Sequence, residues 1–163
     1  IVHIVHQGLM KVTLFFCAGN LAEELGVREV RDLRGVGRRM PLTMGAFTVA
    51  SLGMIGIPPV SGFVSKWYLG IGFFEAGAPW AIGVLLASSL LNAAYFLPLV
   101  HAAWFAEPTR PFHAAPGRAE VRPSLLVPTV ATAALALASG LFAGAEWSPL
   151  GWARFIASRE FRP

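Results

Sequence analysis

The sequence has few charged residues, and long parts of it have none. Asp, Glu, Lys and Arg make up 13% of the chain, against roughly 25% in average globular proteins, and apolar residues make up 55%. No charged residue occurs in residues 40–65, 76–106 or 123–145. Each of these stretches exceeds the ~20 residues that a helix needs to cross a bilayer. The composition excludes an ordinary soluble domain and predicts an integral membrane protein.

Cysteine is nearly absent, and so are the motifs of a redox enzyme. Cys17 is the single cysteine, so no intrachain disulfide can form. The sequence has no glycine-rich dinucleotide turn, and we therefore expect no cofactor. The net charge of +4 does not indicate a nucleic-acid partner, because eleven of the thirteen basic residues lie in expected loops or in the tail.

The apolar stretches predict an all-α, polytopic membrane protein with about four transmembrane helices. These helices are expected at about residues 1–22, 41–74, 80–105 and 125–142. Residues 1–145 form the expected transmembrane part, and residues 146–163 an interfacial C-terminal tail. The aromatic residues that indicate this tail, interspersed with arginines, are Trp147, Trp152, Phe155 and Phe161. Because the chain begins inside an apolar segment with Ile1, we expect it to be the C-terminal part of a longer protein.

The basic residues alternate between the expected loops. The first loop contains Arg28, Arg31, Arg34, Arg38 and Arg39, the third contains Arg110, Arg118 and Arg122, and the tail contains Arg154, Arg159 and Arg162. Four crossings place the first and third loops on one side, and the positive-inside rule makes that side cytoplasmic. We therefore expect a multi-pass protein of the inner (cytoplasmic) membrane. A re-entrant loop in the second helix would move the tail to the other side.

The second expected helix contains the sequence Gly-Met-Ile-Gly-Ile-Pro-Pro-Val-Ser-Gly-Phe-Val-Ser-Lys-Trp. Pro58 and Pro59 remove two backbone donors, so the helix cannot continue through them unbroken, and Gly56 and Gly62 flank the break. Within a membrane such a break survives only against protein or water. Lys66 follows it, and an intramembrane lysine beside a broken helix indicates an ion path. Its alternative role is to bind the freed carbonyl groups.

A polar stripe follows one face of the first expected helix. His3, Gln7 and Lys11 are four residues apart and span about 12 Å, with His6 beside them. The spacing suits a proton path in which water bridges the side chains. For His6 alone, a packed, hydrogen-bonding role is favoured. Metal binding by His3 and His6 is not favoured, because no third ligand is evident.

These two segments resemble the antiporter-like membrane family. That family includes subunits of Mrp-type monovalent cation/proton antiporters and the proton-pumping membrane subunits of respiratory complex I. Residues 3–21, where Thr-Leu-Phe-Phe-Cys-Ala-Gly-Asn follows Lys11, resemble its lysine-bearing helix, and residues 35–67 resemble its next, discontinuous helix. The resemblance is specific over about the first 75 residues and is strongest to a D-type Mrp subunit. It implies a fourteen-helix fold with two inverted repeats, of which this chain supplies the last four helices.

The resemblance also implies roles for single residues. Lys11 corresponds to the family's central-axis lysine and Lys66 to its broken-helix lysine toward the exit side. His3 matches one of two histidines often found on that helix, while Gln7 stands at the position of the second and His6 lies one residue away. We therefore predict proton translocation, coupled to Na⁺ or K⁺ antiport, by a lipid-embedded subunit. The subunit is not an enzyme by itself and assembles with other membrane subunits.

Three alternatives stay open. The first is a proton-pumping subunit of a complex I-like NADH:quinone oxidoreductase or a membrane hydrogenase, although Lys66 disfavours the complex I type with glutamate there. The second is a non-conducting structural subunit, which would pair its lysines with acids in dry protein. A membrane-bound metalloenzyme is the least favoured.

Overall fold

The computed structural model describes residues 2–108, 112 and 119–160, and every regular element in that part of the chain is helical. The elements are α1 (Val2–Leu25), the 3-10 helix η1 (Val30–Leu33), α2 (Val36–Arg39), α3 (Pro41–Ile55), α4 (Ser61–Glu75), α5 (Trp80–Phe105), α6 (Pro123–Leu141) and α7 (Pro149–Glu160). The predicted all-α class is confirmed. Of the residues cited above, Ile1, Arg110, Arg118, Phe161 and Arg162 lie outside the described part.

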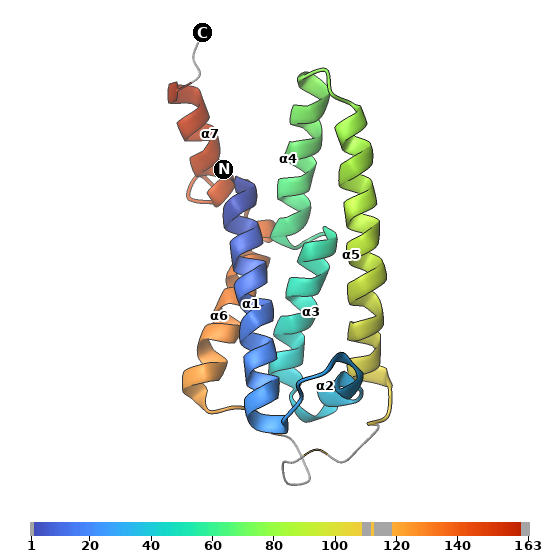
Figure 1. Cartoon of the computed structure of the whole chain (residues 1–163). Coiled ribbons are helices and arrows are strands. Elements are labelled where there is room, and N and C mark those ends of the chain that lie inside the picture. The colour runs from blue at the N-terminus through green and yellow to red at the C-terminus, as the bar shows by residue number, and fades with distance from the viewer. Residues whose placement is uncertain (1, 109–111, 113–118, 161–163) are drawn as a thin grey trace.

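The predicted interruption of the second helix is confirmed and separates α3 from α4. Gly56, Pro58 and Pro59 lie between the two helices, whereas Gly62 falls in the first turn of α4. In Figure 1, α4 continues in the same general direction as α3, so the chain does not turn back at the break. The α3–α4 pair therefore runs in one direction, as a single crossing would require, and does not form a re-entrant loop.

The long helices lie side by side in a bundle (Figure 1). α1 packs against α3 and α6, and α3 packs against α5 and α6. The segment of η1 and α2, the end of α5 and the start of α6 lie at one end of the bundle, and the α4–α5 turn and α7 lie at the other. This arrangement brings the first and third loops to the same end, as four crossings require.

Two of the described helices, α5 and α6, are each long and apolar enough to cross a membrane, and α3 is a shorter apolar helix. α3 and α4 have 15 residues each, or about 22 Å each. Neither alone spans a hydrocarbon core of about 30 Å, whereas the stacked pair, at about 45 Å, is more than long enough to do so. Large apolar side chains on the outside of the bundle, including Phe15, Phe74, Trp80 and Leu91, are exposed. Such a surface suits lipid or neighbouring membrane helices.

The start of α3 is held by a carboxylate from the segment before α6. Glu120 Oε1 accepts a hydrogen bond from the amide of Leu42 at 2.7 Å, and Oε2 accepts one from Thr43 Oγ1 at 2.8 Å. The first amides of a helix have no partner within the helix, so a side-chain acceptor here stabilises it. The amide of Ala119 also donates to Arg39 O at 2.8 Å. The chain before α6 is therefore fixed against the chain before α3.

Two glycines let the backbones meet at the break. A Cβ added to Gly62 would overlap the carbonyl of Gly53, so the first turn of α4 lies directly on the last turns of α3. A Cβ added to Gly140 would overlap the carbonyl oxygen of Pro59, so α6 covers the break itself. The structure thus assigns a packing role to Gly140, which the sequence did not single out.

We expect Gly62→Ala to destabilise the fold by about 1–3 kcal/mol, because the added methyl group forces α4 away from Gly53. Gly70→Ala in the same helix is the matched control, since a Cβ there meets no atom within 4 Å. Thermal unfolding of the purified full-length protein in detergent measures both variants. Equal unfolding midpoints for the two variants would contradict the close contact.

Candidate functional site

The site is built around the two carbonyl groups that the prolines leave without partners. In an α-helix, the carbonyl of residue i accepts from the amide of residue i+4. The partners of Met54 O and Ile55 O would be the amides of residues 58 and 59, and Pro58 and Pro59 have none. Lys66 Nζ takes their place and donates to each carbonyl at 2.9 Å. The alternative role that the sequence offered for Lys66, a partner for the freed carbonyls, therefore exists as a contact.

The third donor of the Lys66 ammonium goes to another helix. Nζ lies 2.8 Å from Ser89 Oγ on α5, so three acceptors match the three N–H groups of a charged lysine. Gly56 leaves room for the side chain: a Cβ at that position would lie 2.9 Å from Lys66 Cδ, and its φ of +93° favours glycine. Lys66 thus joins α3, α4 and α5 at the break.

His3 reaches the same region from α1. Its Nδ1 lies 3.0 Å from Ser65 Oγ, in the residue before Lys66. The Ser65 hydroxyl can donate to Gly62 O at 3.1 Å, and the tautomer of His3 sets which atom donates between His3 Nδ1 and Ser65 Oγ. His3 also lies within electrostatic range of both Lys66 and Lys11. The structure therefore brings His3 and Lys66 to one site.

His6 points into the protein rather than lying beside an exposed stripe. It is fully buried, and neither ring nitrogen has a hydrogen-bond partner among the described residues. The hydroxyl groups of Ser51 and Ser61 are also buried without partners there. Buried polar groups of this kind bind ordered water in protein interiors. His6 therefore has the packed position favoured for it, beside the backbone of Ser61 on α4, and its hydrogen-bonding role stays a prediction.

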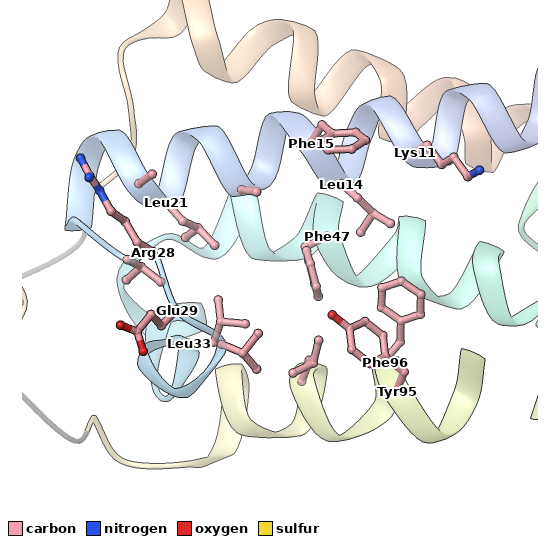
Figure 2. Close-up of a pocket in the computed structure, with 15 residues that line it drawn as sticks. Lys11, Leu14, Phe15, Leu21, Arg28, Glu29, Leu33, Phe47, Tyr95 and Phe96 are labelled. Atoms are coloured by element: carbon pink, nitrogen blue, oxygen red, sulfur yellow. The ribbon is translucent and has the colours of Figure 1, made fainter. Parts of the chain in front are cut away.

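Lys11 and Gln7 lie apart from the Lys66 contacts. Lys11 is exposed on α1 and makes no hydrogen bond or ion pair with a described residue, and half-buried Gln7 makes no hydrogen bond with one. Lys11 lines a groove of about 850 Å³ between α1, η1, α3 and α5. Figure 2 shows it at the opposite end of this groove from Arg28 and Glu29. The groove wall between them is mainly apolar.

Hydrogen bonds between α1 and α6 were not anticipated from the sequence. Thr13 Oγ1 donates to Thr132 Oγ1 at 2.9 Å, and Asn20 Nδ2 donates to Thr129 Oγ1 at 3.0 Å. The sequence shows that polar residues recur along α1, but it does not show which residues of α6 face them. These bonds fix α1, and with it His3, against the rest of the bundle.

Acidic residues do not pair with either lysine within the described part of the chain. The salt bridges found there join Arg31 to Glu29 and Arg122 to Glu23, near the helix ends. No three His, Cys, Asp or Glu side chains of the described residues come together as a metal site.

Comparison with known proteins places these features in a family. A family model described as "NADH:quinone oxidoreductase/Mrp antiporter, TM" matches residues 1–92. The chain is 43% identical over 151 residues to NADH-quinone oxidoreductase subunit N of Desulforudis audaxviator, covering 87% of this chain and 30% of that protein. It is 32% identical over 148 residues to the D-type subunit of the Na⁺/H⁺ antiporter of Bacillus subtilis, covering 90% and 29%.

A solved structure shares the arrangement of the helices. One chain in the structure of the Mrp complex from Dietzia sp. DQ12-45-1b matches with a TM-score of 0.75 and 26% identity, covering 94% of this chain and 36% of that one. The present chain therefore spans less than a third of the length of the two curated relatives above and about a third of the structural one.

The contacts of the two lysines predict different effects on stability. Lys66→Met leaves the carbonyls of Met54 and Ile55 without donors, and we expect a loss of about 1–3 kcal/mol for each. Lys11→Met is the matched control, and we expect little change because Lys11 makes no such contact. Thermal unfolding of the full-length protein checks the difference. A Lys66→Met variant as stable as the Lys11→Met variant would show that the carbonyls find another donor.

Proposed function

The chain belongs to the NADH:quinone oxidoreductase/Mrp antiporter transmembrane family, and from this premise we propose that it takes part in moving protons across a membrane in exchange for Na⁺ or K⁺. It is a membrane protein, and relatives of it are named as subunits of antiporters and oxidoreductases. Because the chain spans less than a third of those relatives, the proposal concerns the complete protein in its assembly.

The observation that carries the proposal is the position of Lys66. An ionisable side chain inside a membrane is costly, so it is kept where it is used or where it is strongly bound. Here the ammonium sits at a helix break with all its donors engaged, and His3 reaches the adjacent residue from α1. A titratable residue on each of two neighbouring helices provides the start of a path.

The remaining predicted residues extend that path along α1. Lys11 lies two helical turns from His3, and Gln7 lies between them on the same face. Gln7 and buried His6 can bind the water molecules that connect titratable groups. In this proposal Lys11, His3 and Lys66 exchange protons, and His6 and Gln7 hydrate the route.

The choice of Na⁺ or K⁺ as the exchanged ion is supported by the likeness to the Bacillus subtilis Na⁺/H⁺ antiporter protein and to the Mrp complex. The proposed partners are other membrane subunits, as in those assemblies. The bacterial sources of these relatives, together with the basic residues gathered at one end of the bundle, support a place in the cytoplasmic membrane.

A second candidate is a proton-pumping subunit of a complex I-like oxidoreductase. It is favoured by the 43% identity to a protein named NADH-quinone oxidoreductase subunit N, which exceeds the 32% identity to the Na⁺/H⁺ antiporter protein. The two candidates share the lysine path and differ in the driving force, which is an electron donor in one and a cation gradient in the other. The non-conducting scaffold is less favoured, because neither lysine pairs with an acid in the described part of the chain.

We expect proton movement driven by a Na⁺ or K⁺ gradient in vesicles that contain the full-length protein and its partner subunits. Lys66→Ala and Lys11→Ala should each slow it on the order of 100-fold at unchanged assembly, because a positioned proton donor and acceptor is lost. His3→Ala should also slow it, whereas His101→Ala, an exposed histidine on α5, is the control that should not.

Normal rates in both lysine variants, with assembly intact, would overturn the path. If the rate of proton movement does not depend on the cation gradient but rises when a reduced electron donor is added, the second candidate replaces the antiport proposal.

A further inference from the structure

The three contacts of Lys66 differ in what they can do chemically. Met54 O and Ile55 O are carbonyl oxygens and can only accept hydrogen bonds. Ser89 Oγ is a hydroxyl oxygen, which can accept a hydrogen bond and also donate one. Of these three contacts among the described residues, the one with Ser89 can therefore reverse its direction.

This difference matters when Lys66 changes its protonation state. A charged ammonium has three donors, and all three are engaged here. A neutral amine has two N–H groups and one lone pair. The two N–H groups can stay on the carbonyls of Met54 and Ile55, so the helix end keeps its partners. The lone pair then faces Ser89, whose hydroxyl can rotate to donate to it.

We propose that Ser89 is the group through which Lys66 exchanges its proton on the side of α5, while His3 serves the side of α1, a role that rests on the proton-translocating function proposed above. On release, an N–H bond of the Lys66 ammonium breaks and its proton forms a new O–H bond on Ser89. The original hydroxyl proton of Ser89 passes at the same time to a water molecule, which becomes hydronium. Ser89 is neutral before and after, Lys66 becomes a neutral amine, and uptake follows the same steps in reverse.

Ser89 opens onto a space that is large enough to admit that water, with the Lys66 amino group and the Ser89 hydroxyl as its polar partners. Lys66 and Ser89 both line a groove of about 860 Å³ between α4 and α5. Its other walls are mainly apolar, and the acid that lines it is Glu75, in the last turn of α4. The apolar walls offer no competing proton acceptor between Ser89 and Glu75. Ser88, the preceding residue, lines a different hollow with Asn92.

The other helices around the break contribute little that could replace Ser89. α3 and α6 contain no titratable residue. α1 contributes His3, which contacts Ser65 rather than Lys66, and buried His6, which makes no hydrogen bond to Lys66. On α5, Tyr95 and His101 follow Ser89 by more than one helical turn. The direction toward Ser89 is therefore the direct route by which the Lys66 amino group can meet an exchangeable hydroxyl.

The test compares Ser89→Ala, Ser89→Thr and Ser88→Ala in vesicles with the full-length protein and its partner subunits. The initial rate of proton movement is measured per assembled complex, in H₂O and in D₂O. Ser89→Ala should slow the rate at least tenfold and raise the ratio of the H₂O rate to the D₂O rate. Ser89→Thr retains the hydroxyl and should keep at least half of the wild-type rate. Ser88→Ala should match the wild type.

The possible outcomes distinguish a failure of this inference from a failure of the proposed proton translocation on which it rests. A wild-type rate in Ser89→Ala, with Lys66→Ala inactive, would overturn the role of Ser89 and leave the lysine path in place. Equal losses in Ser89→Ala and Ser89→Thr with an unchanged isotope ratio would assign Ser89 to packing and also overturn it. A wild-type rate in Lys66→Ala would contradict both the proposed function and this inference.

Discussion

The structure depends on one requirement, that backbone carbonyls inside a membrane must have hydrogen-bond donors. Two adjacent prolines remove the amides that would serve Met54 and Ile55, and one lysine seven residues after Pro59 replaces both. The replacement fixes the position of α4 relative to α3. It also fixes α5, because the same ammonium reaches Ser89. The glycines at the break then allow the backbones to approach closely enough for this geometry.

Much of this arrangement could be predicted from local chemistry. The absence of charge marked the apolar helices, and Pro58 and Pro59 marked the break, because the effect of proline on its own helix is independent of the tertiary fold. The contact between Lys66 and the freed carbonyls was one of two roles open to that residue. It is a local contact, made across 11 or 12 residues of chain, and the sequence contains what is needed to foresee it.

The parts that could not be predicted involve partners from distant helices. The contact of Ser89 with Lys66 depends on how α5 packs against the break, and the contact of Gly140 with Pro59 depends on how α6 packs there. The contact of Glu120 with the start of α3 depends on the position of the segment before α6. Helical spacing put His3, Gln7 and Lys11 on one face but could not say which face is covered. The packing buries the side chain of His6 and leaves that of Lys11, five residues later on α1, exposed.

The carboxylate at one end of α3 and the ammonium at the other have a joint electrostatic consequence. The peptide dipoles of a helix sum to about half a positive charge at its N-terminus and half a negative charge at its C-terminus. Glu120 therefore compensates the positive end of α3, and Lys66 compensates the negative end. In the proposed mechanism, loss of the Lys66 proton would leave the negative end of the α3 dipole without its counter-charge, while Glu120 would still compensate the other end. The dipole of α3 would then favour the return of a proton to the Lys66 amine.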